Sequence, residues 1–167
     1  MTTAAKRAAW QLFIENSARL QTELDRRLRA EGMCLADYHV LLSLHEAPGR
    51  RLRMNEISRR MIFSASRLTY QVDVLRRRGW VRRETAAEDR RGSYAVLTDE
   101  GEAAFQKAAA AHGDDVDELF FAAVSDDDAA VLVDIMVRVG ERLGIDGTRD
   151  EAEPAHPAAP RERSQTP

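Results

Sequence analysis

The chain has 167 residues, which is enough for one domain of ordinary size with a real hydrophobic core. Hydrophobic residues make up 44% of it but aromatic residues only 6%, which favours a mostly helical protein. No stretch approaches about twenty consecutive apolar residues, and the N-terminus lacks the apolar region of a signal peptide, so we expect a cytoplasmic protein without a membrane span. The single cysteine, Cys34, excludes an internal disulfide framework and a cysteine-based zinc cluster.

The charge is split by position along the chain. The whole chain is formally −3, but residues 50–94 hold thirteen arginines against five acidic residues, a net charge of +8. Residues 95–167 hold six basic groups against seventeen acidic ones, a net charge of −11, and the first 49 residues are neutral. A patch this basic inside an acidic protein indicates binding to a polyanion.

The first part of the chain shows the period of α-helices. Apolar residues recur at spacings of three and four, with charged residues between them. Glycine and proline residues, such as those in Ala47-Pro48-Gly49, mark where these stretches stop. The pattern predicts three helices, over residues 6–30, 35–45 and 54–61.

A fourth helix is predicted to begin after Phe63 and to end before Gly79, with the hydroxyl of Ser64 as its N-cap. Its apolar stripe consists of Leu68, Val72 and Leu75. The opposite face carries side chains that suit base edges and phosphates. An ordinary solvated helix face would look similar, but the surrounding +8 segment favours DNA binding. The residues of this face are Ser66, Arg67, Thr69, Tyr70 and Asp73.

After Gly79 the pattern changes to that of strands. Residues 80–85 and 93–97 are predicted to pair as a β-hairpin, joined by a polar, arginine-rich loop over residues 86–92. Thr98 can cap a fifth helix that runs to about Ala123, and Ser125 can start a sixth. Residues 147–167 lack apolar periodicity and are predicted to form a disordered tail.

Three short helices followed by a two-stranded hairpin is the pattern of a winged helix-turn-helix, whose last helix enters the major groove. We therefore expect a mainly α fold with a small two- to three-stranded antiparallel β-wing, and residues 35–97 as the DNA-binding domain. Residues 1–34 and 98–146 are expected to form a helical dimerisation region, because the winged domain alone is too small to cover their apolar faces.

Three segments carry a resemblance to a known family. Glu88–Gly101 resembles the wing of the MarR (multiple antibiotic resistance regulator) family, which has an Asp, a basic residue and an Arg, then a strand ending in Leu-Thr, then a Gly. Leu75–Val81 is similar to the exit of the family's recognition helix, and Met54–Ser58 is similar to the start of its third helix. The resemblance covers about residues 8–144.

The resemblance implies a homodimeric transcriptional regulator, more often a repressor, that binds a pseudo-palindromic double-stranded operator. Its half-sites would lie one helical turn apart, about 34–36 Å. Arg91 would reach into the minor groove, with Asp89 orienting its guanidinium and Arg90 contacting phosphate. Ser66, Arg67, Thr69 and Tyr70 match the family's contact positions on the recognition helix, although many members carry Arg or His in place of Tyr70.

Many members of the family release DNA when a small anionic or phenolic compound binds between the dimer region and the winged domain. The candidate residues for such a crevice are Trp10, Phe13, Tyr38, His39 and His45, each of which is more simply explained as core or surface. Oxidant-sensing relatives carry a cysteine near the start of the first helix. Because Cys34 lies after that helix, we expect a buried structural cysteine.

Two other classes of function are compatible with parts of the sequence. The sequence has no phosphate-binding glycine loop, no nucleophile elbow and no metal-ligand spacing, so we expect no enzyme, no metal and no cofactor. Two acidic clusters, residues 114–118 and 126–128, are open to interpretation as a divalent-cation site of an enzyme, but capping of helix starts explains them more simply. The other alternative is an architectural DNA-binding protein without a sensing function.

Overall fold

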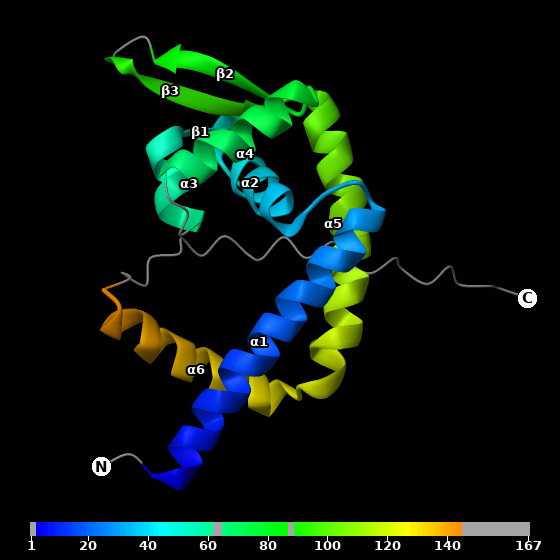
Figure 1. Cartoon of the computed structure of the whole chain (residues 1–167), viewed down its shortest axis with the longest axis vertical. Helices are drawn as coiled ribbons and strands as arrows, with labels where there is room; N and C mark the ends of the chain where they lie inside the picture. The colour runs from blue at the N-terminus through cyan, green and yellow to red at the C-terminus, as the bar shows by residue number, and fades with distance from the viewer. Residues whose placement is uncertain (1–2, 62–64, 87–88, 145–167) are drawn as a thin grey trace, which may run out of the picture. The chain divides into compact units, whose positions relative to one another are not determined.

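A computed structural model describes residues 3–61, 65–86 and 89–144 and confirms the mainly α fold with a small antiparallel sheet (Figure 1). The chain divides into two compact units, Met1–His112 and Gly113–Pro167, and each is described by itself. The predicted N-cap Ser64 and the predicted tail, residues 147–167, lie outside the described residues. The helices are α1 (Ala4–Ala30), α2 (Leu35–His45), α3 (Met54–Met61), α4 (Ala65–Arg77), α5 (Asp99–Leu119) and α6 (Asp126–Arg142), and the strands are β1 (Arg51–Arg53), β2 (Val81–Ala86) and β3 (Asp89–Leu97).

Side-chain caps explain where several helices begin. At α2, the Cys34 Sγ accepts the Asp37 N–H at 3.4 Å, and the Asp37 carboxylate accepts the Cys34 N–H at 3.3 Å. The Thr98 hydroxyl accepts the Gly101 N–H at 3.0 Å at the start of α5, as predicted. Such bonds satisfy backbone donors that have no partner within the helix.

The three strands form one antiparallel sheet in the order β1-β3-β2. Strand β1 was not located from the sequence, because three residues are too few to show a strand period. The predicted loop over residues 86–92 was also wrong. Strand β3 already begins at Asp89, which pairs with Ala86, and an irregularity between Thr85 and Ala86 shifts the register there.

One hydrophobic core joins α2, α3, α4 and the inner face of the sheet (Figure 1). Each helix contributes the apolar side of its 3.6-residue period, and each strand contributes alternate residues. The largest of the fully buried side chains are Leu28, Met33, Val40, Leu41, Leu44, Ile57, Leu68, Val72, Leu75 and Val81. This core fixes the direction in which α4 and the sheet present their outer surfaces.

The second unit contains the end of α5, a short 3-10 helix (Phe121–Ala123) and α6. Helix α5 ends at Leu119, not near Ala123 as predicted. The interpretation of residues 114–118 as a helix start was wrong as well, because they lie near the carboxyl end of α5, where acidic groups oppose the helix dipole. Residues 126–128 do lie in the first turn of α6, where Ser125 and Asp128 form a reciprocal cap. Among the described helices, none is both long and apolar enough to span a bilayer.

Candidate nucleic-acid interface

Helix α4 presents a polar face because its opposite face is locked into the core. Leu68, Val72 and Leu75 are at most 1% exposed. Of the five side chains predicted to face outward, Ser66, Arg67, Thr69 and Tyr70 are exposed, and Tyr70 has 66% of its surface accessible. The fifth, Asp73, is half-buried. Helix α4 therefore presents hydroxyl, guanidinium and phenol groups on its outer face.

A buried polar contact that the sequence did not reveal ties α4 to α2. Gln71 lies on the inner face of α4, and its Nε2 donates a hydrogen bond to the Asp37 Oδ1. Asp37 is only 3% exposed, and the Arg78 Nη1 lies 3.9 Å from its other oxygen. Arg78 also donates to the Gly32 carbonyl at 2.6 Å. In the sequence, the only sign of this contact is a polar residue, Gln71, directly before Val72 of the apolar stripe. Its partner, Asp37, lies 34 residues earlier in the chain.

Cys34 lies next to this contact. It was predicted to be buried but is only half-buried, and its Sγ lies 3.9 Å from the Gln71 Nε2. Burial raises the pKa of the Cys34 thiol, and the nearby Asp37 carboxylate also contributes to the increase. A raised pKa keeps the thiol protonated and less nucleophilic, in keeping with a structural role.

The wing is the hairpin of β2 and β3. The side chains of Asp89, Arg90 and Arg91 lie outside the described part of the structure, although their backbone forms the start of β3. Nearer the core, the Arg83 Nη2 lies 3.7 Å from the Asp73 Oδ1 on α4, which links the wing to the helix. This pair adds to the packing of β2 against α4.

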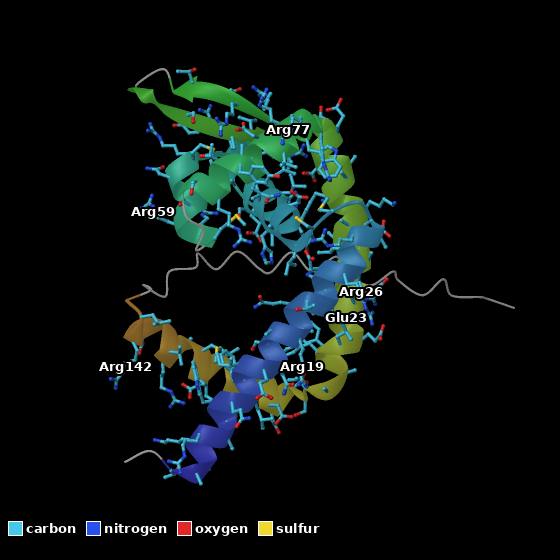
Figure 2. All side chains as sticks on the ribbon, viewed as in Figure 1. Arg19, Glu23, Arg26, Arg59, Arg77 and Arg142 are labelled. Carbon is cyan, nitrogen blue, oxygen red and sulfur yellow. The ribbon has the colours of Figure 1, made fainter. Side chains whose placement is uncertain are left out.

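Exposed arginines surround this surface. Arg59 on α3 and Arg77 on α4 are both exposed (Figure 2). Arg76 is also exposed and pairs only loosely with Asp73, at 3.6 Å. Cations without tight ion pairs add to a positive potential that attracts a polyanion from a distance.

The five residues predicted to line a ligand crevice fall into two groups. The rings of Tyr38 and His45 on α2 both lie tilted against the Phe105 ring of α5, with centroids 5.4 and 4.8 Å from the Phe105 centroid. His39 is an exposed neighbour of Tyr38. Trp10 and Phe13 lie on α1 and are both exposed, and their ring centroids are 6.3 Å apart.

The chemistry around Tyr38 and His45 is set by burial and ion pairing. Burial raises the pKa of Tyr38 to about 12, with a smaller contribution from Glu46. The His45 Nδ1 lies 3.0 Å from the Glu102 Oε2. Burial raises the pKa of Glu102, but the hydrogen bonds from Gln106 and His45 and the charge of Arg50 outweigh it, so the net pKa is below its ordinary value. In the residues that the structure describes, no group of three or more His, Cys, Asp or Glu residues is arranged to hold a metal ion.

Helices α3 and α4 with the sheet behind them define a winged helix-turn-helix protein. A family model described as MarR family matches residues 31–92. The solved structure of AbsC from Streptomyces coelicolor, a MarR family transcriptional regulator, is 30% identical with a TM-score of 0.82, covering 86% of this chain and 97% of AbsC. The chain belongs to the MarR family of transcriptional regulators.

Two further relatives support this assignment. Sco3205, a MarR family regulator from Streptomyces coelicolor solved in complex with DNA, is 38% identical with a TM-score of 0.81, over 86% of this chain and 94% of its own. The HTH-type transcriptional regulator PrsX from Escherichia coli is 35% identical over 91 residues. That match covers 54% of this chain and 55% of PrsX, so it spans about half of the curated relative.

Proposed function

We propose that the chain is a sequence-specific double-stranded DNA-binding transcriptional regulator, acting as a repressor in the cytoplasm. The observation that carries this proposal is the exposed polar face of α4, which is fixed from behind by a buried apolar face and lies within a segment of net charge +8. The DNA present in the structure of Sco3205 supports it. Binding alone performs this function, so neither catalysis nor a cofactor is required.

Each part of the interface has a distinct role in this proposal. Arg67 and Tyr70 of α4 contact base edges in the major groove, while Ser64, Ser66 and Thr69 contact phosphates or base edges. Arg91 enters the minor groove, because a narrow minor groove concentrates negative potential. Asp89 orients Arg91, and Arg90 contacts phosphate.

The partner that completes the protein is a second copy of this chain. Helix α6 exposes a series of apolar side chains, and so does the amino-terminal half of α1, an arrangement that single soluble chains avoid. We propose that residues 1–34 and 98–146 form the dimerisation region and residues 35–97 the DNA-binding domain. A two-fold dimer reads a pseudo-palindrome with half-sites about 34–36 Å apart. The exposed residues are Trp10, Leu12, Phe13 and Ile14 on α1, Val131, Val133, Ile135, Met136, Val137 and Val139 on α6, and Leu143 directly after α6.

The test is a mobility-shift titration on a duplex that the protein selects from a random-sequence pool. Arg67→Ala should relax the preference at one position of each half-site, with a loss of roughly 1–3 kcal/mol for a bidentate contact. Arg91→Ala should weaken binding strongly while helicity and dimer mass stay unchanged. Arg29→Ala on α1 is the control, because it also removes one exposed positive charge.

The outcomes separate the candidate functions. Unchanged affinity of Arg91→Ala would show that the wing assignment is wrong. Equal affinity of the wild-type protein for every duplex would indicate an architectural DNA-binding protein. No DNA binding at all would refute the proposed function.

A small anionic or phenolic effector is proposed to release the DNA. Such a compound shifts the equilibrium only if it binds the DNA-competent and released arrangements with different affinities. An aromatic acid would bind against the ring cluster of Tyr38, Phe105 and His45, of which Tyr38 and Phe105 are buried. Benzoate and phenol are suitable probes, and release of labelled duplex from the wild-type protein but not from Tyr38→Ala is the expected result.

A further inference from the structure

The outer face of the sheet is a basic surface separate from the recognition helix. Cross-strand partners share a face of a sheet, and residues two apart along a strand do so as well. The register places six residues together on the side away from the helices. This outer sheet face consists of Arg51 and Arg53 of β1, Arg82 and Glu84 of β2, and Tyr94 and Val96 of β3.

The opposite side of the same strands is the core. Leu52, Val81, Ala95 and Leu97 occupy the alternate positions and are all at most 6% exposed. Burial of these side chains fixes the register, because a slip of one residue would exchange the two faces. On the outer sheet face, Arg51 and Arg82 are therefore exposed, Arg53 is half-buried, and Val96 is covered, with 5% of its surface exposed.

Tyr94 organises the two arginines of β1. The Arg51 guanidinium carbon lies 4.0 Å from the centre of the Tyr94 ring, and that of Arg53 lies at 5.2 Å. The Arg53 Nε also donates a hydrogen bond to the Tyr94 hydroxyl at 3.1 Å. Stacking and hydrogen bonding of this kind hold the guanidinium groups in place, which lowers the entropy lost when they bind a further group.

The net charge of the outer sheet face is positive. Three arginines stand against one acidic residue, Glu84, which pairs with Arg82 and lies 4.0 Å from Arg51. The side chains of Arg51 and Arg82 are 46% and 57% exposed even with these pairs formed. A guanidinium that keeps much of its surface accessible can still bind an oxyanion, and its planar fork matches phosphate.

We propose that the outer sheet face binds the phosphate backbone of the duplex that flanks each half-site. This inference rests on the proposed function, which places the start of β3 in the minor groove. Strand β3 carries both Arg91 and Tyr94, and three residues of strand span only about 10 Å. The outer sheet face thus begins well within one helical turn of the wing tip, about 34 Å. Continuity with a DNA-binding strand favours duplex DNA over an acidic protein as the occupant.

The experiment compares two duplexes of different length. The short duplex contains only the base pairs for which the protein shows a sequence preference, and the long duplex adds one helical turn of arbitrary sequence at each end. Arg51→Ala/Arg53→Ala should weaken binding to the long duplex by roughly tenfold and leave binding to the short duplex nearly unchanged. The salt dependence on the long duplex should also fall, by about 0.9 in slope for each phosphate that the variant no longer neutralises.

Two further variants keep the test independent of folding defects. Glu84→Gln removes the only acidic group of the outer sheet face and should strengthen binding to the long duplex alone. Arg26→Ala/Arg29→Ala on α1 removes two exposed positive charges elsewhere and should leave the ratio of the two affinities unchanged (Figure 2 shows Arg26).

An unchanged ratio for Arg51→Ala/Arg53→Ala, or an equal loss on both duplexes, would overturn the proposal. So would tighter binding to an acidic peptide than to the flanking duplex, since it would identify a protein partner. Failure of the wild-type protein to bind the short duplex is a different result, because it refutes the proposed function itself.

Discussion

Substitution of Gly101 by alanine should disrupt the junction between the wing and α5. An alanine Cβ at this position would overlap the Trp80 carbonyl oxygen, and would lie 2.8 Å from the Trp80 carbonyl carbon and 2.9 Å from the Leu97 Cδ1. The same Trp80 carbonyl accepts the Thr98 N–H at 3.1 Å, so it cannot retreat without loss of that bond. At a helix position with free space around it, the change from glycine to alanine would raise the free energy of unfolding by about 1 kcal/mol.

At Gly101, the steric overlap turns this stabilisation into a destabilisation. Overpacking costs about 1–3 kcal/mol and more when backbone has to move, so we expect a net loss of at least about 2 kcal/mol in the free energy of unfolding. For a chain of this size, that corresponds to a fall of roughly 4–8 °C in the midpoint of thermal unfolding. Circular dichroism measures it, with Glu100→Ala at the neighbouring exposed position as the control. A Gly101→Ala protein as stable as the wild type would refute the reasoning.

Three other predictions follow from particular residues. Gln71→Leu removes the amide that donates to the buried Asp37 carboxylate, and it should lower the free energy of unfolding in urea by about 1–3 kcal/mol. An unchanged urea midpoint would show that this hydrogen bond contributes nothing to stability. Because burial raises the pKa of Tyr38 to about 12, the unfolded chain ionises first as pH rises. The free energy of unfolding should therefore fall by up to about 3 kcal/mol as the pH rises from ~10 to ~12, while the full stability is kept below pH ~10. Tyr38→Phe should abolish that loss. Removal of residues 147–167 should leave the unfolding temperature and DNA affinity nearly unchanged, and a large loss of stability would show that this segment packs.

The sequence predicted the elements whose information is local. The helices were found because their apolar period extends over several turns, and Ser125 and Thr98 were recognised as caps because a cap acts within three residues. The outward direction of Arg67 and Tyr70 followed from the same period.

Features that depend on distant parts of the chain were missed. Strand β1 exists because Arg51–Arg53 pairs with residues of β3 more than 40 positions away, and nothing in those three residues indicates it. The contact between Gln71 and Asp37 is of the same kind. Gly101 was recognised through the family resemblance, but the reason for it, the closeness of the Trp80 backbone, became visible only in the structure.

The central claim is that a dimer reads two half-sites through α4 and the wing. Hydroxyl-radical footprinting of the purified protein on its selected duplex tests this claim most directly. We predict two protected half-sites related by a two-fold axis, with centres about one helical turn, 34–36 Å, apart. Protection of a single half-site, or failure to select any sequence, would contradict it.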